Sequence, residues 1–241
     1  MISRIEKTPM NTSEAESWER EYTKGGIPSS VRTEPSGAVV DFFNNCVGRG
    51  AVGHALDIGC GSGRNSLFIA ERGFRVQSID YAKSQIEALK RSVTALNLVD
   101  RVDPILADIR TSWPVVEASV DVVVDAFCFK HQITSHDISH YASELGRVSV
   151  HGAKYLISFA GRDDGYYSKF PHSTETGPGQ VIVDPQNQIA SRLYEPKEVL
   201  DIFHAYFSPL RIQRKEMKNE MHGGTYDRVT HILWLERRAS N

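Results

Sequence analysis

The chain has 241 residues, with 28 Lys and Arg against 30 Asp and Glu and a hydrophobic share of 40%. This length predicts one domain, and a net charge of −2 lacks the basic excess typical of proteins that bind nucleic acid. No apolar run approaches the roughly 18 residues of a membrane span, and the polar start lacks the apolar core of a secretory signal. Three separated cysteines predict neither a disulfide framework nor a zinc site, so we expect a cytoplasmic protein.

Short apolar runs alternate with amphipathic segments over most of the chain. A polar N-terminal segment contains one predicted helix at 13–22, and Pro35 and Ser36 open an apolar stretch with helical spacing. The predicted strands that follow are 54–58, 74–79, 102–107, 120–127 and 153–159, and the predicted helices are 64–72, 84–98 and a segment around 138–148. Such alternation predicts a doubly wound α/β fold with a mostly parallel sheet and helices on both faces.

The last third of the chain breaks this alternation. A predicted helix at 196–206 precedes two strand-like runs at 210–217 and 227–236, which we expect to form an antiparallel pair at the sheet edge and to complete seven strands. The stretch 161–195 contains a hairpin signal around Asp184-Pro185 and reads as a lid or substrate wall. We therefore predict an N-terminal helical cap segment at 1–34 and a domain at 35–241, with an insertion at about 161–195.

A glycine-rich turn follows the first strand. Asp57 precedes three glycines at alternate positions, Gly59, Gly61 and Gly63, which allow a tight turn and a close approach of a ligand. A second acid, Asp80, ends the next strand, where a carboxylate can bind the two hydroxyls of an adenosine ribose. The dinucleotide fingerprint requires a glycine or alanine at its sixth position, and Arg64 or Ser66 stands there instead, so a pyrophosphate site is disfavoured.

The run 56–63 resembles the first motif of class I S-adenosylmethionine-dependent methyltransferases. Three later elements resemble further motifs of that family: Asp80-Tyr81, Ala107-Asp108-Ile109 and the fourth strand up to Phe127. The resemblance covers about residues 35–160 and implies S-adenosyl-L-methionine as cofactor, with S-adenosyl-L-homocysteine as product. It implies that the second acid holds the ribose, the third meets the adenine, and the fourth strand faces the methionine part and the substrate.

The expected cofactor site combines this resemblance with the chemistry of the ligand. Asp57 can take the ammonium group, and the helix that begins near Gly63 offers free N–H groups to the carboxylate. The cofactor-binding residues that we expect are Asp57, Gly59, Cys60, Gly61, Gly63, Asn65, Asp80, Tyr81, Asp108, Ile109, Asp125, Phe127, Tyr22 and Arg32. The alternative for each aspartate is a helix cap or a turn residue.

A looser resemblance links 61–67 and the segment from Trp18 to Ser36 with the branch of tellurite-resistance and small-molecule thiol methyltransferases. It implies small substrates and an N-terminal segment that closes over the cofactor. Trp18, Tyr22 and Arg32 would then lie near the methionine end, with the arginine on its carboxylate. The alternative is a packing Trp/Tyr pair and a solvated arginine.

Candidate substrate residues follow the fourth and fifth strands, because open parallel sheets bind ligands beyond the carboxyl ends of their strands. His131 is a candidate general base, since an unperturbed histidine has a pKa of about 6.5; its alternative is a packing or surface histidine. The expected catalytic residues are His131, Asp125 and Tyr166. The expected substrate contacts are Trp18, Cys128, Lys130, His131, Arg162, Tyr166, Tyr167 and His222. The alternatives are a packed thiol for Cys128, a solvated lysine for Lys130, and loop packing for the residues after the fifth strand. His136 and His140 are four residues apart, but no third ligand is in sight, so we predict no metal.

Together these features predict methyl transfer from S-adenosylmethionine to an N, O or S atom of a small molecule. We expect a small-molecule partner, no nucleic acid, no membrane, and a monomer or homodimer. Two alternatives remain: the same fold binding this cofactor without methylating, and a nicotinamide-dependent oxidoreductase on a Rossmann sheet. Arg64 and the antiparallel tail argue against the oxidoreductase.

Overall fold

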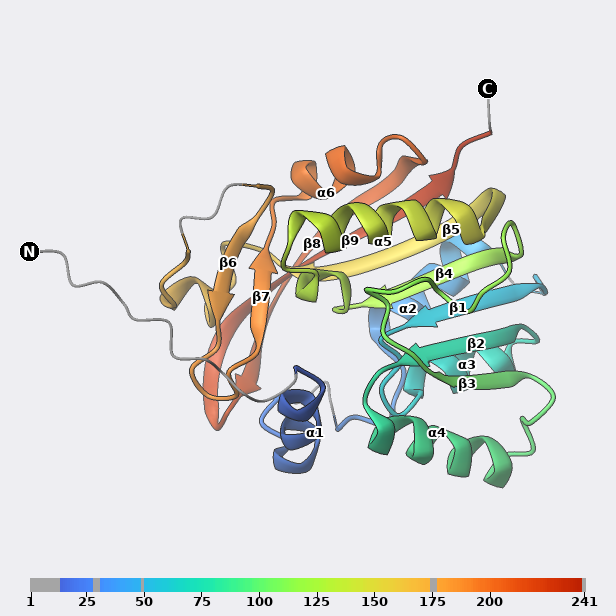
Figure 1. Cartoon of the computed structure of the whole chain (residues 1–241), viewed down its shortest axis with the longest axis horizontal. Coiled ribbons are helices and arrows are strands. Elements are labelled where there is room, and N and C mark those ends of the chain that lie inside the picture. The colour runs from blue at the N-terminus through green and yellow to red at the C-terminus, as the bar shows by residue number, and fades with distance from the viewer. Residues whose placement is uncertain (1–13, 28–30, 49, 174–176, 240–241) are drawn as a thin grey trace, which may run out of the picture.

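The computed structural model describes residues 14–27, 31–48, 50–173 and 177–239. Its centre is a seven-stranded sheet in the order β3-β2-β1-β4-β5-β9-β8, in which the first five strands of that order are parallel, β9 is antiparallel to β5, and β8 is antiparallel to β9 (Figure 1). The strands are β1 His54–Ile58, β2 Arg75–Asp80, β3 Val102–Leu106, β4 Val120–Ala126, β5 Ser149–Ala160, β8 Phe207–Met221 and β9 Gly224–Arg237. The predicted fold class and the antiparallel C-terminal pair are confirmed.

Helices cover both faces of this sheet because its central strands are apolar on both sides. In β4, Val122 packs into one core cluster and its neighbour Val123 into the other, as the alternation of side chains along a strand requires. The first cluster includes residues of α2 Gly37–Phe42, α3 Arg64–Glu71 and α4 Lys83–Ala95. The second includes residues of α5 Ser135–Val148 and α6 Pro196–Phe203.

The helix boundaries have local causes. A capping box between Thr134 and Asp137 starts α5, and Pro196 at the first turn with a Glu195–Glu198 capping box starts α6. The apolar stretch predicted after Ser36 forms α2 and then a π-helical turn, Phe43–Val47. These helices leave the carboxyl ends of β1 to β4 free on one edge of the sheet.

The C-terminal strands are longer than the hydrophobic pattern predicts. β9 pairs with β5 only from Thr230 to Glu236, so the half of the β8–β9 hairpin nearer its turn extends beyond the sheet. Most side chains of β8 are exposed, and a strand that buries neither face carries no apolar alternation in its sequence.

The predicted insertion holds a short helical turn, Tyr167–Lys169, and a separate hairpin of β6 Gln180–Val183 and β7 Ala190–Leu193. A third, smaller apolar cluster joins this segment to the turn of the long hairpin through Tyr166, Ile182 and Met221. The N-terminal helix α1, Glu14–Lys24, lies beside these two hairpins and the start of α4 (Figure 1).

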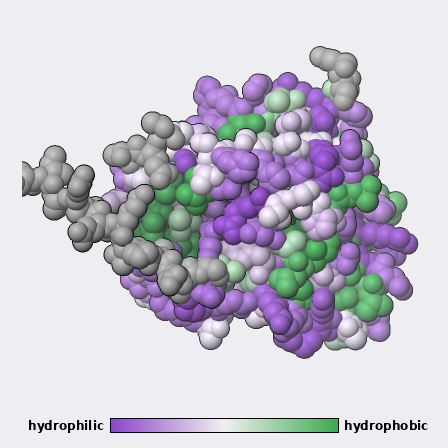
Figure 2. All heavy atoms as spheres, viewed as in Figure 1, coloured by the Kyte–Doolittle hydropathy of each residue, from purple (hydrophilic) through white to green (hydrophobic). Residues whose placement is uncertain are grey.

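Hydrophilic residues dominate the face shown in Figure 2, and hydrophobic ones gather there in separate groups. No helix in the part of the chain that the structure describes is both long and apolar enough to cross a bilayer.

Candidate cofactor and substrate site

A cleft lies at the carboxyl ends of β1 to β4, with α1 opposite them. It gathers most of the residues that the motifs indicate. The expected cofactor and substrate residues that line it are Trp18, Tyr22, Arg32, Gly59, Cys60, Gly61, Asn65, Asp80, Tyr81, Asp108, Ile109, Phe127, Cys128 and His131. Motifs far apart in the chain therefore meet in one place.

The floor of the cleft is the glycine turn after β1. Gly59 has φ +66°, and a Cβ there would lie 2.7 Å from Cys128 Sγ. Gly63 has φ +86°, and a Cβ there would lie 2.1 Å from Leu89 Cδ1 of α4. Both positions therefore require glycine, for the left-handed backbone and for the close approach of a neighbour.

Asp80 at the end of β2 holds this turn and keeps acceptor capacity. Its Oδ2 accepts a hydrogen bond from the Gly61 N–H at 2.8 Å, and its Oδ1 accepts one from the Ala82 N–H at 2.8 Å. A carboxylate has about four lone-pair sites, so about two remain for the hydroxyls of a ribose. Burial raises the pKa of Asp80, although the backbone N–H donors oppose the shift.

Asp108, after β3, forms an ion pair that reaches across to α1. Arg110 donates to both of its carboxylate oxygens, and Arg110 Nη1 lies 2.5 Å from Glu14 Oε2. Burial alone would raise the pKa of Asp108, but the hydrogen bonds and charge of Arg110 outweigh it and lower that pKa. An ionised acid at this end suits the amino group of an adenine.

Two arginines occupy the same cleft. Arg32, after α1, donates to Asn219 Oδ1 at 3.3 Å, and Arg64 begins α3 directly after the glycine turn. Burial and the nearby charge of Arg32 both lower the pKa of Arg64, whereas the Asp57 carboxylate raises it. Two guanidinium groups in one cleft suit a ligand carboxylate.

Asp57, Gly63 and Asp125 lie behind the cleft and do not line it. The Ser66 hydroxyl donates to Asp57 Oδ2 at 2.6 Å, which ties β1 to α3. Asp125 accepts from the Cys128 and Phe129 N–H groups and from the Tyr141 hydroxyl, all within 2.8 Å. Burial raises the pKa of each of these two acids to about 7, against the hydrogen bonds that favour their charged forms. The structure thus gives both acids protein partners, and direct ligand contacts for them stay a prediction.

Aromatic side chains form the other end of the cleft. The rings of Trp18 and Tyr22 have their centroids 5.6 Å apart, and Trp18 packs edge-on against His131 at 5.1 Å. Phe127, just after β4, has φ +75°, a conformation that costs free energy for a residue with a Cβ. Backbone strain of this kind concentrates at ligand sites, and here it marks the end of the strand that faces the cleft.

The hydrogen bond of His131 determines its tautomer. Its Nδ1 lies 2.8 Å from the Ala190 carbonyl oxygen, which can only accept, so Nδ1 carries the proton and Nε2 keeps a lone pair. Burial, with the charge of Lys130, lowers the pKa of His131 to about 3, so the ring is neutral at neutral pH.

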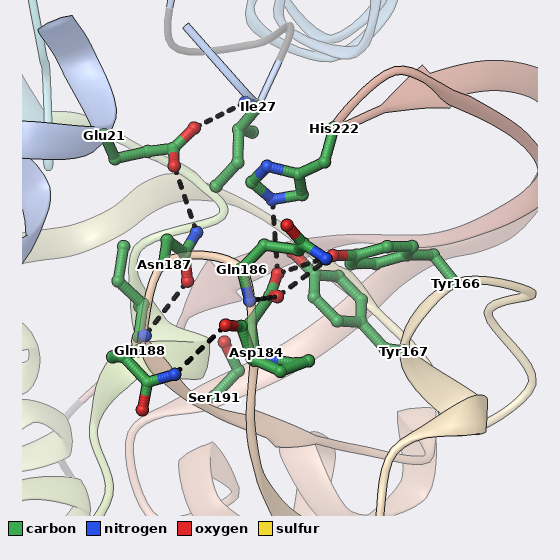
Figure 3. Close-up of polar contacts among 12 residues, drawn as sticks. Glu21, Ile27, Tyr166, Tyr167, Asp184, Gln186, Asn187, Gln188, Ser191 and His222 are labelled. Atoms are coloured by element: carbon green, nitrogen blue, oxygen red, sulfur yellow. Dashed lines mark hydrogen bonds and ion pairs between the residues drawn. The ribbon is translucent and has the colours of Figure 1, made fainter. Parts of the chain in front are cut away.

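Five of the expected substrate residues lie outside the cleft lining: Lys130, Arg162, Tyr166, Tyr167 and His222. Lys130 Nζ donates to Tyr167 Oη at 3.0 Å, and Arg162 pairs with Glu198 at 2.5 Å. The Tyr166 hydroxyl donates to Asp184 at 3.0 Å, and His222 Nε2 lies 3.4 Å from the same carboxylate. Figure 3 shows this buried group between the β6–β7 hairpin and the turn of the β8–β9 hairpin. In this structure these side chains contact other protein groups, and their role towards a substrate stays a prediction.

Eight lining residues were not predicted as ligand contacts: Glu14, Ser62, Arg64, Ile79, Ala107, Arg110, Ala126 and Gln132. Arg110 lies two residues after a motif acid, and Arg64 follows the last motif glycine, so adjacency to a motif was the available signal. Nothing in the sequence marks Gln132. Among the described residues, no three His, Cys, Asp or Glu side chains come together as metal ligands.

Residues 55–152 match the family model of a methyltransferase domain. A similar solved structure is the Burkholderia thailandensis 1,6-didemethyltoxoflavin-N1-methyltransferase with bound 1,6-didemethyltoxoflavin and S-adenosylhomocysteine, at TM-score 0.70 and 17% identity over 93% of this chain and 87% of that one. A SAM-dependent methyltransferase from Methanosarcina mazei has a TM-score of 0.67 at 18% identity, over 86% of this chain and 100% of that one. The [4+2]-cyclase SpnF has a TM-score of 0.58 at 15% identity, over 79% of this chain and 77% of that one.

At these identities the solved structures establish the fold. The domain match covers the glycine turn, β4 and the four motif acids Asp57, Asp80, Asp108 and Asp125. The residues present also fit the cofactor, since Asp80 has free lone pairs, Asp108 is ionised and two arginines lie nearby. Residues 55–152 thus match a methyltransferase domain, and the chain shares the fold of solved S-adenosylmethionine-dependent methyltransferases.

Proposed function

We propose that this enzyme methylates an N, O or S atom of a small molecule. The observation that carries the proposal is the aromatic end of the cleft, where Trp18, Tyr22 and Phe127 lie beside His131. α1 lies opposite the strand ends and contributes Trp18 and Tyr22 to the lining. Aromatic side chains of this kind support a planar small molecule as the substrate.

The cofactor roles that we propose follow the chemistry of the lining. Asp80 and Tyr81 bind the ribose, Asp108 and Ile109 the adenine, and Arg32 with Arg64 the carboxylate. The turn residues Gly59, Cys60, Gly61, Gly63 and Asn65 carry the backbone past the ligand, and Asp57 and Asp125 hold that backbone in place. We also propose that residues 1–34 act as a cap and 161–195 as a substrate wall.

When bound, S-adenosylmethionine supplies a methyl group activated by a positively charged sulfur. The protein's task is then to position the acceptor and exclude water. Trp18 and Tyr22 do so from α1, and Phe127 does so from the turn just after β4. His131 Nε2 can accept a proton that leaves the substrate atom to be methylated. Because the pKa of His131 is lowered, we expect this nitrogen to orient the substrate through a hydrogen bond more than to deprotonate it.

Two comparisons bear on the choice of reaction. The Burkholderia enzyme acts on a small molecule at a ring nitrogen by its name, which favours a small substrate here. The resemblance of 61–67 to the tellurite and thiol branch keeps sulfur open as an acceptor. A cyclase of the same fold favours the second candidate, a non-methylating catalyst, which would release no S-adenosylhomocysteine.

The first experiment is a thermal-shift comparison of S-adenosylmethionine, S-adenosylhomocysteine and NADH. A ligand at about 100 times its Kd adds about 2.7 kcal/mol, which raises Tm by about 5–10 °C at this chain length. We expect that rise with the first two ligands and none with NADH. A screen of small aromatic acceptors for S-adenosylhomocysteine release then tests methylation, and a rise with NADH alone would overturn the proposal.

A further inference from the structure

Gln132 is a buried amide in the wall of the cleft, next in sequence to His131. The residue is among those that line the cleft, it is 3% exposed, and no described residue donates a hydrogen bond to its buried Oε1. A buried carbonyl oxygen without a donor costs free energy. A ligand that brings its own N–H or O–H would remove that cost.

His131 presents a second acceptor on the same wall. Its Nδ1 proton is directed to the Ala190 carbonyl, and Ser191 Oγ lies on that side too, 3.4 Å away. No described residue donates to Nε2, which keeps the lone pair. The low pKa of the ring preserves this lone pair at neutral pH.

The surroundings restrict what can reach these two acceptors. Trp18 stands edge-on to the His131 ring at 5.1 Å, so the space beside it suits a flat group. Lys130, the cation next in sequence to His131, is buried and donates to Tyr167 Oη, away from the cleft lining. His131 and Gln132 thus contribute two neutral acceptors, and the arginines of the cleft come from other segments.

We propose that His131 Nε2 and Gln132 Oε1 form a double-acceptor site that selects a small planar molecule with two N–H or O–H donors. This inference rests on the proposed function, because it concerns the acceptor substrate of the same cleft. It narrows that substrate to rings carrying amide, urea, amine or hydroxyl donors. A simple thiol or a chalcogen oxyanion has no such pair of donors.

The test uses three rings of nearly equal size that differ in donors: 2-benzimidazolinone with two N–H groups, 2-benzoxazolinone with one, and 2-coumaranone with none. Their affinities for the full-length protein saturated with S-adenosylhomocysteine are measured by isothermal titration calorimetry at pH 7. A site built to accept hydrogen bonds discriminates strongly against a ligand that lacks the donor. We expect the affinity to fall at least tenfold from the first ring to the second, and again to the third.

Gln132→Met removes the acceptor oxygen at similar side-chain volume. In this variant one of the two affinity differences between successive rings should shrink to less than threefold. The matched control is Gln85→Met on α4, outside the cleft, which should keep both steps. The inference would be overturned if the three rings bound with equal affinity or if none of them bound. It would also be overturned if Gln132→Met kept both affinity differences. The thermal shift with S-adenosylhomocysteine reports the proposed function separately, so a failure of the inference alone leaves that shift in place.

Discussion

Three aspartates that follow strands of this sheet end in three different surroundings. Asp80 faces the cleft with free acceptor capacity, and Asp108 is held ionised by Arg110. Asp125 instead collects three donors from the turn after β4 and from Tyr141. Its role in this structure is to hold the turn that carries Cys128 and His131 towards the ligand.

The first prediction at this scale concerns Asp125→Asn. The amide has one acceptor oxygen for three buried donors, so we expect a loss of about 1–3 kcal/mol of stability. Burial raises the pKa of Asp125 to about 7, above its unfolded value of about 3.9. Between these two pKa values the folded state binds more protons than the unfolded state. The stability that this protonation contributes is fully present below about pH 4 and is lost as pH rises through 7. The substitution should cost more at pH 5.5 than at pH 8.

Urea denaturation of both proteins at the two pH values measures this difference. Asp103→Asn, at an exposed position of β3, is the control and should change stability little at either pH. A cost that is the same at both pH values, or larger at pH 8, would contradict the assigned protonation of Asp125.

Among the elements, α1 joins the two ends of the site. Glu14 pairs with Arg110 beside Asp108, and Glu19 accepts from the Ser84 N–H at the start of α4. At the other end, Glu21 accepts from the Ile27 N–H and from Asn187 Nδ2 of the β6–β7 hairpin (Figure 3). A ligand beneath α1 is therefore retained by contacts on both sides of the cleft.

The next prediction separates retention of the ligand from stability. Glu14→Gln removes the charge that pairs with Arg110 and leaves the Arg110–Asp108 pair intact. Because the pair is partly exposed, the substitution should change stability by only about 0–1 kcal/mol. We expect S-adenosylhomocysteine to dissociate several-fold faster, as measured by stopped-flow displacement. Glu87→Gln breaks an exposed pair on α4 and should leave the dissociation rate unchanged; if both variants behave alike, α1 does not retain the ligand through this pair.

The helices and strands whose buried side chains recur at a regular spacing could be predicted from the sequence. β1 begins and ends where its apolar run does, and the glycine turn with Asp80 predicted the floor of the cleft. β8 could not be bounded this way, since most of its side chains are exposed. Gln132 could not be predicted as a lining residue either, because a glutamine after a strand has many surface roles and only the tertiary fold buries it. Tyr166 and His222 looked like substrate residues because tyrosine and histidine carry chemistry, yet both pack around Asp184.

Across the whole molecule, the N-terminal segment meets the turn between the last two strands. The His222 N–H donates to the Gly26 carbonyl at 2.8 Å, and the imidazole ring packs against the same glycine. The His222 ring is itself held beside Asp184 and Tyr166. One glycine thus joins the cap, the inserted hairpin and the C-terminal hairpin.

The last prediction tests this joint. In Gly26→Ala the new Cβ would lie 2.3 Å from His222 Nδ1, and this ring is buried and held beside Asp184. Overpacking of this kind costs about 1–3 kcal/mol. We expect a lower Tm and at least fivefold weaker binding of S-adenosylhomocysteine, because α1 is displaced. Gly37→Ala is the control: no atom lies within 4 Å of its Cβ, so it should bind normally. Normal binding by Gly26→Ala would show that α1 closes without this joint.

The contact between Gly26 and His222 also sets an order of events during translation. The glycine turn, Asp80 and Asp108 all leave the ribosome long before residue 222, so a nascent chain can present the cofactor-binding edge of its sheet while its cleft is still open. The N-terminal helix can reach Arg110, Ser84 and His131 earlier, but its contact with the C-terminal hairpin waits for the turn after β8. The joint at Gly26 is therefore among the last contacts that a newly synthesised chain can make.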